Sequence, residues 1–127
     1  MIAAMLQKEL GDGFEVESAA WWKKGIGDPA NENSILCMEE KGIDISNHKV
    51  RWIGNIDLNQ FACIVCVDRD MGDKIRSIIE NDKTTILVVN EDGGGLPDPF
   101  EKGLPAYREC IALIGKDLSR LAASVRV

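Results

Sequence analysis

The chain has little that would direct it into a membrane or out of the cell. None of its apolar runs approaches the roughly 20 residues that a transmembrane helix requires. Residues 1–10 contain neither the basic stretch nor the small-residue cleavage site of a secretory signal. We therefore expect a cytoplasmic protein that does not bind membranes.

Histidine is scarce too, with His48 alone, and the four cysteines are Cys37, Cys63, Cys66 and Cys110. A zinc site on the Cys63-x-x-Cys66 pair would need two more ligands at suitable spacing, so we expect no metal and no other cofactor. The pair lies inside an apolar run that indicates a buried strand, not the helix start of a redox motif. We predict that both cysteines are small core residues on opposite faces of this strand.

Basic residues are outnumbered, with 15 Lys and Arg against 21 Asp and Glu, for a net charge of −6. Proteins that bind nucleic acid backbones normally carry the opposite balance, so we expect no nucleic acid partner. The 127 residues, 45% of them hydrophobic, are enough for one core. We expect a single domain over residues 1–127.

Helical and strand-like patterns alternate along the chain. We predict helices over residues 1–10 and 31–41, a third capped by Asp70, and a fourth opened by Pro105; strands over Phe14–Ser18, Phe61–Val67 and Thr84–Val89; and a short helix over Ile56–Phe61. This order predicts an α/β fold, with a Rossmann-like parallel sheet flanked by helices. The loop over residues 90–105 contains three consecutive glycines and is long enough to be functional.

Six segments, in order along nearly the whole chain, resemble the low-molecular-weight protein tyrosine phosphatases. They are Met1–Leu6, Val16–Ala19, Glu40–His48, Cys66–Met71, Pro97–Phe100 and Tyr107–Cys110. The third contains the family's G-I-D-x-S-x-H pattern and the fifth its D-P-[YF] loop. The resemblance implies a phosphotyrosine protein phosphatase I-like fold and hydrolysis of phosphate monoesters, on phosphotyrosine proteins or small aryl phosphates.

The same resemblance implies a C-x5-R-S phosphate loop between the family's first strand and first helix. Met1 aligns beyond this loop, so we expect the first strand, the nucleophilic cysteine and the phosphate-binding arginine to be absent. Cys63 is followed by Arg69 at the required spacing, but the residues between them include Asp68 and no glycine. Such a segment is a poor anion nest. We therefore expect the chain to be inactive as written.

Three residues match the family's catalytic cleft. Asp98 matches the general acid that protonates the leaving oxygen, although an Asp-Pro turn is the alternative interpretation. Phe100 matches the aromatic residue that flanks the cleft. Trp22, or less directly Trp21, resembles the aromatic residue of the facing loop that stacks on the substrate ring.

Ser18 and His48 match residues that support the phosphate loop through hydrogen bonds. With no loop to bind, these two polar groups would need other partners or water. An ordinary structural histidine is an equally good interpretation of His48.

Absence of a central strand would leave backbone groups unpaired, at a cost of about 1–3 kcal/mol for each buried group. The neighbouring strands could close up, another segment could fill the gap, two chains could associate, or the natural product could be longer. Three functions therefore stay open: a truncated form of an active phosphatase, a non-catalytic binding module, and an assembly module such as a homo-oligomer joined through the sheet gap.

Overall fold

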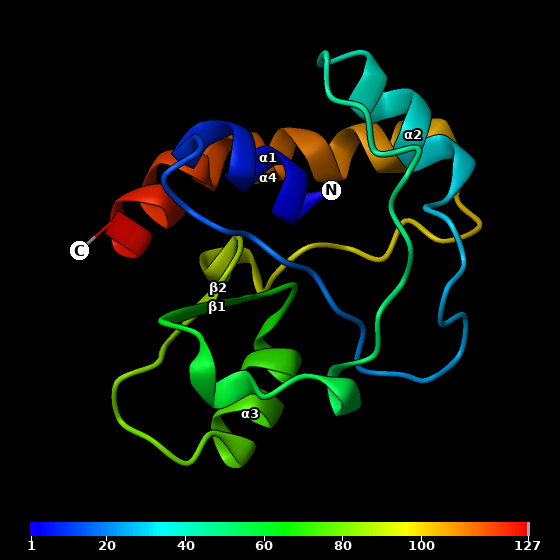
Figure 1. Cartoon of the computed structure of the whole chain (residues 1–127). Coiled ribbons are helices and arrows are strands. Elements are labelled where there is room, and N and C mark those ends of the chain that lie inside the picture. Colours follow the sequence, from blue (N-terminus) through cyan, green and yellow to red (C-terminus); the bar gives the residue numbers. More distant parts are fainter. Residues whose placement is uncertain (127) are drawn as a thin grey trace.

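The computed structural model describes residues 1–126 as an α/β arrangement of four helices around a short parallel sheet. The elements are α1 (Ile2–Leu10), α2 (Glu32–Glu39), β1 (Cys63–Cys66), α3 (Arg69–Ile78), β2 (Thr85–Val88) and α4 (Leu104–Arg126), with 3₁₀ turns at Ile53–Asn55, Leu58–Gln60 and Glu91–Gly93. In Figure 1, α1, α2 and α4 lie on one side of the strands and α3 lies on the other. None of the described helices is long and apolar enough to cross a membrane.

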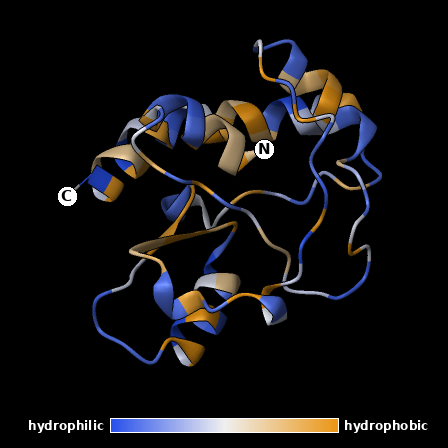
Figure 2. Ribbon diagram, viewed as in Figure 1, coloured by the Kyte–Doolittle hydropathy of each residue, from blue (hydrophilic) through white to orange (hydrophobic). Residues whose placement is uncertain are grey.

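The described sheet consists of β1 and β2, which run parallel with Cys63 opposite Thr85 and Cys66 opposite Val88. Both are mainly hydrophobic along their length (Figure 2). These are the two covered strands predicted from the sequence, and their parallel pairing is confirmed. The central residues of both predicted strands are confirmed. Each observed strand is one or two residues shorter at either end than the strand predicted from the sequence.

The predicted strand over Phe14–Ser18 is wrong, because the segment is extended but pairs with no described strand. The side chain of Gln7 on α1 takes the place of a neighbouring strand. Its Oε1 atom accepts a hydrogen bond from the Val16 N–H group at 3.0 Å, and its Nε2 atom donates to the Phe14 carbonyl at 2.8 Å. The segment therefore has the alternating sequence of a strand, but it forms no strand because it has no neighbouring strand with which to exchange backbone hydrogen bonds.

The outer edge of β1 is free. The Thr85 and Val89 N–H groups donate to the carbonyls of Ala62 and Cys66, which fixes the residues of β1 that face β2. Because this ladder uses alternate residues, the backbone groups of Cys63 and Val65 face the other way. No described residue outside the sheet bonds to them.

The core has two parts. A larger cluster joins α1, α2 and α4, with Met38, Ile114 and Leu121 completely buried. A smaller cluster beneath α3 contains the buried residues Cys66 and Ile75, together with Val88. The strands lie between the two clusters, since partly buried Val65 and Leu87 pack against the larger one.

Two helix starts refine the sequence expectations. The residue that caps α3 is Asp68, whose carboxylate accepts a hydrogen bond from the Met71 N–H group at 2.8 Å, so the assignment of the cap to Asp70 is wrong. The reason is that α3 starts as soon as β1 ends, which leaves Asp70 inside the first turn, where it pairs with Lys74. The last helix starts beside Pro105, as predicted.

Candidate functional site

The carboxyl ends of β1 and β2 hold the loop that carries Asp98, and this is the edge of a parallel sheet at which ligands usually bind. The loop is fixed to the end of β1 by backbone hydrogen bonds. The Leu96 N–H group donates to the Val67 carbonyl at 2.8 Å, and the Arg69 N–H group donates to the Gly94 carbonyl at 3.2 Å. Asp98 thus follows directly from an anchored stretch of backbone.

Gly95 makes this anchoring possible. Its φ angle is +119°, and a Cβ atom built on it would lie 2.4 Å from the Cα atom of Asp68. Asn90, itself in the left-handed region at φ 50°, donates from Nδ2 to the Gly95 carbonyl at 2.9 Å. Together with Gly94, at φ +86°, these residues give the loop after β2 three positive φ angles that set its course.

A salt-bridged pair on α4 holds the start of the same loop. The Arg120 guanidinium donates to Asp117, with Nε 2.6 Å from Oδ1, and also to the Val88 carbonyl at 2.7 Å. Asp117 accepts a hydrogen bond from the Asn90 N–H group at 2.9 Å. Hydrogen bonding by Arg120, and to a lesser degree by Asn90, lowers the pKa of Asp117 despite its partial burial. Sequence reasoning missed this pair, for which the three-residue spacing on a helix was the only signal.

Replacing Asp117 with asparagine is expected to lower the free energy of unfolding at pH 7 by about 1–3 kcal/mol, because a charge-assisted network is lost. A folded-state pKa below the ordinary value of 3.8 means that the carboxylate stabilises the fold above pH 3.8. That contribution disappears as pH falls through the lower folded-state value. Urea unfolding of the wild type and of Asp117→Asn, at pH 7 and at a series of lower pH values, measures the free energy of unfolding of each. The difference in free energy between the two proteins should become smaller in acid.

Asp73→Asn is the matched control for this prediction. Asp73 forms an ion pair with Arg76 at the same spacing on α3, but its side chain is exposed. Such surface pairs contribute little, typically below about 1 kcal/mol. Equal losses from the two variants, or a loss from Asp117→Asn that stays constant in acid, would contradict the network as described.

Asp98 lies in an exposed turn between Pro97 and Pro99. Its Oδ1 atom accepts a hydrogen bond from the Phe100 N–H group at 3.0 Å, and its other oxygen bonds to no described residue. The Cys110 thiol on α4 donates to the Pro97 carbonyl at 3.2 Å and tethers the turn. The turn interpretation and the general-acid interpretation are thus compatible, because one carboxylate oxygen remains accessible.

The two predicted rim aromatics are both exposed, Trp22 at 69% and Phe100 at 61%. The Trp22 ring lies beside α3, with its centroid 5.8 Å from Lys74 Nζ. Phe100 belongs to the turn of Asp98. Among the described residues no hydrogen bond or cation–π contact joins Trp22 to this turn, so the structure does not assemble a closed rim.

Ser18 and His48 are the two residues predicted to support a phosphate loop. Ser18 is half-buried and His48 is exposed, and neither side chain forms a hydrogen bond with a described residue. Local desolvation of the imidazole, and then the nearby Met1 ammonium group, lower the pKa of His48. Their supporting role stays a prediction.

The four cysteines are all free thiols. Burial raises the pKa of each thiol, to about 11 in the case of Cys66. Cys63 lies on β1 and Arg69 is the first residue of α3, so the segment between them is a strand followed directly by a helix cap. The interpretation of this segment as a strand is confirmed. Within residues 1–126 no group of three His, Cys, Asp or Glu is placed to hold a metal ion.

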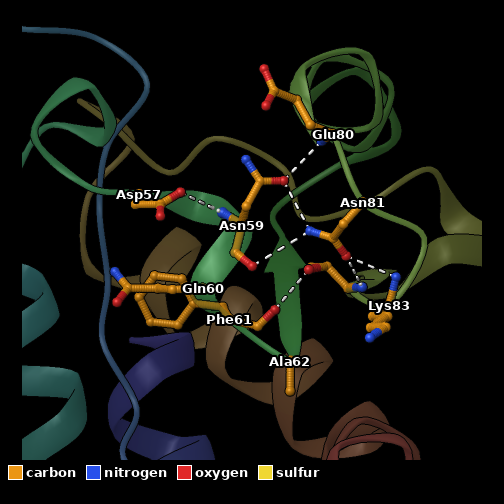
Figure 3. A pocket seen from close by; sticks show the side chains of 9 residues that line it. Asp57, Asn59, Gln60, Phe61, Ala62, Glu80, Asn81 and Lys83 are labelled. Atoms are coloured by element: carbon orange, nitrogen blue, oxygen red, sulfur yellow. Dashed lines mark hydrogen bonds between the residues drawn. The ribbon is translucent and has the colours of Figure 1, made fainter.

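A hollow of about 620 Å³ lies at the opposite edge, where β1 and β2 begin (Figure 3). Its polar side chains mainly bind backbone. Asn59 Oδ1 accepts hydrogen bonds from the Glu80 N–H group at 2.8 Å and from Asn81 Nδ2 at 2.9 Å, while Asn81 Oδ1 accepts from the N–H groups of Lys83 and Thr84. This hollow is a structural junction between the strand starts and the end of α3.

A parallel sheet between helices, with an anchored Asp-Pro turn at its carboxyl edge, agrees with the α/β fold that the family resemblance implies. The profile of the family described as low molecular weight phosphotyrosine protein phosphatase matches residues 1–127. The chain belongs to this family.

One relative agrees with this assignment, and solved structures share the fold. The low molecular weight protein-tyrosine-phosphatase YfkJ of Bacillus subtilis is 25% identical over 126 residues, which covers 94% of this chain and 80% of the relative. The fold resembles Vibrio vulnificus Wzb in complex with benzylphosphonate, with a TM-score of 0.81 and 23% identity over 97% of this chain and 87% of that one. It also resembles the YwlE arginine phosphatase of Geobacillus stearothermophilus, with a TM-score of 0.78 and 23% identity over 98% and 82% of the two chains.

Proposed function

We propose that this chain is a phosphomonoesterase homologue that provides the acid and part of the substrate rim but does not itself turn over phosphate esters. The feature that carries the proposal is the placement of the cysteines: within residues 1–126 Cys63 and Cys66 lie on β1, Cys37 on α2 and Cys110 on α4, and burial raises the pKa of each thiol. Phosphoryl transfer to cysteine needs a thiolate held beside the bound phosphate.

Asp98 is the proposed general acid, with Phe100 and Trp22 as rim residues and Ser18 and His48 as supports of a phosphate loop. The accessible Asp98 oxygen and the exposure of both aromatics support these roles. The proposed substrate class is a phosphotyrosine protein or a small aryl phosphate. The name of the YwlE relative adds phosphoarginine as a second compound to test.

The experiment is a turnover assay of the 127-residue chain with p-nitrophenyl phosphate and with phosphoarginine, over pH 5–8. We expect rates equal to those of buffer alone, and no change on Asp98→Asn, because an acid without a nucleophile has no reaction to assist. The B. subtilis relative, assayed in parallel, shows that the conditions permit turnover. Hydrolysis that is abolished by Cys63→Ser would overturn the proposal.

A binding or assembly role is the second candidate, and the free outer edge of β1 favours it. Unpaired N–H and carbonyl groups, here those of Cys63 and Val65, are a template for a further strand. Light scattering measures the outcome directly. A mass above 14.0 kDa supports self-association through this edge, provided that Val65→Pro, which removes one edge N–H group, restores the monomer mass.

A further inference from the structure

A groove lies between α2 and the start of α4, two helices on the side of the sheet opposite to α3 (Figure 1). Its volume is about 320 Å³, at the lower end of the range of roughly 300–1,000 Å³ that is usual for binding pockets. The side chains that line it, which we call the α2–α4 groove, are Leu36, Glu39, Glu40, Leu104 and Arg108. None of these residues belongs to the candidate site or to the free edge of β1.

Two leucines supply the apolar part of the groove. Leu36 is 51% exposed on α2, whereas Leu104 is partly buried and packs against the larger core cluster. The Cys37 thiol donates to the Leu104 carbonyl at 3.9 Å, a contact that joins α2 to the first residue of α4. The two leucines are therefore held on connected helices, and a partner's apolar side chain can contact both without reordering them, which reduces the entropy lost on binding.

A bidentate ion pair crosses from α4 to α2 beside these leucines. The Nε and Nη2 atoms of Arg108 each donate to a different carboxylate oxygen of Glu40, both at 3.1 Å. Hydrogen bonding by Arg108 lowers the pKa of Glu40. Arg108 is the one cation among the five lining residues, whereas Glu39 forms no ion pair with any residue that the structure describes. The charge that remains available in the groove is therefore negative.

The position of the two glutamates is unfavourable for α2 itself. Glu39 is the last residue of the helix and Glu40 is its C-terminal cap, and the last turn contains no basic residue. The backbone carbonyls at a helix C-terminus already concentrate negative charge there. Arg108 offsets this effect at Glu40 but not at Glu39. Residues that weaken local stability in this way are expected mainly at functional sites.

The surrounding charges also leave acidic residues in excess. The charged residues within four positions of a lining residue are Glu32, Lys41, Asp44, Glu101, Lys102 and Glu109, four acids and two bases. One further base is close, because Lys8 Nζ donates to the Lys41 carbonyl at 3.2 Å. The whole chain has a net charge of −6, so its field attracts a cationic partner as well.

We infer that the α2–α4 groove binds a basic amphipathic segment of a partner protein, with an apolar side chain against Leu36 and Leu104 and a lysine or arginine beside Glu39. A helical segment in such a groove presents its apolar residues at spacings of three and four. A second copy of this chain fits less well, because two copies with a net charge of −6 repel each other. The inference concerns a surface that the proposed function does not use.

Calorimetric titration of the full chain with the acetylated peptide amide Lys-Leu-Lys-Lys-Leu-Leu-Lys-Lys-Leu-Lys tests the inference. One control peptide has serine in place of every leucine and keeps the charge, and another has glutamine in place of every lysine and removes it. We expect saturable binding that weakens with salt, and binding of each control peptide at least about fivefold weaker. Leu36→Ala is expected to raise Kd at least about fivefold, and Glu39→Gln about two- to fivefold.

Ile78→Ala and Glu80→Gln are the matched control variants, an exposed aliphatic residue and an exposed glutamate at the end of α3, on the other side of the sheet. Both should leave Kd unchanged, and circular dichroism of each variant confirms that it is folded. Failure to saturate, equal affinity for the serine peptide, or equal effects of control and test variants would overturn the inference.

Light scattering of the chain without peptide tests the competing occupant. An oligomer that Leu36→Ala dissociates and Val65→Pro does not would also overturn the inference, in favour of a second copy of this chain in the groove. Because the peptides carry no phosphate and the test variants lie outside the turn of Asp98, these outcomes are independent of the turnover assay.

Discussion

Replacing Gly95 with alanine is expected to lower the free energy of unfolding by about 3–5 kcal/mol, through backbone strain and overlap together. The new Cβ atom would lie 2.4 Å from the Asp68 Cα atom and 2.6 Å from the Val67 carbonyl oxygen, and neither backbone atom can move without disturbing the end of β1. A loss of this size is a large share of the roughly 5–15 kcal/mol that a domain possesses. Chemical denaturation followed by tryptophan fluorescence gives the value.

Gly94→Ala separates the two causes. Gly94 also has a positive φ angle, +86°, but a Cβ atom there meets nothing within 4 Å. Its expected cost is therefore that of the left-handed conformation alone, about 1–2 kcal/mol. If Gly95→Ala is no more destabilising than Gly94→Ala, the close approach of the loop to β1 is not formed as described.

The second large effect is expected from Leu121→Ala, at about 2–5 kcal/mol. Leu121 has no exposed surface and belongs to the cluster that joins α1, α2 and α4. Its truncation removes buried apolar contacts and leaves a space that the helices can close only in part. The same denaturation experiment measures the loss.

Leu36→Ala makes the same chemical change on α2, where the leucine side chain is 51% exposed. We expect a change within about 0.5 kcal/mol, because no cavity forms and alanine favours the helix. Comparable losses at the two positions would show that α4 is not the centre of the core.

The sequence predicted the helices and the two covered strands well, because their patterns are local. Apolar residues at helical spacing marked α1 and α4, and continuous apolar runs marked β1 and β2. The segment Phe14–Ser18 shows the limit of this reasoning. Its alternation describes which side chains face the core, but whether it becomes a strand depends on a backbone partner, and the Gln7 side chain takes that position.

The candidate site was predictable only through family resemblance. Asp98 and Phe100 were found by their motif, and the structure adds how their turn is held, through Cys110 and the pair of Asp117 and Arg120. Apart from the three-residue spacing of Asp117 and Arg120 on α4, these supports are contacts between residues that lie 13 to 32 positions apart in the sequence, and no local pattern predicts them. The interaction between Lys74 and Trp22 is likewise a product of the fold.

The two-part core also bears on which parts of the molecule open first. The cluster beneath α3 has three buried members, while the cluster around α4 has twelve. Regions with few buried contacts open locally at a lower free energy than the whole chain unfolds. Amide hydrogens of α3 should therefore exchange with solvent well before those of α4. Asp68, which caps α3, is bridged to Gly95, so we expect each such opening to loosen the segment that leads to Asp98 and the mobility of Asp98 to depend on the stability of a helix on the far side of the sheet.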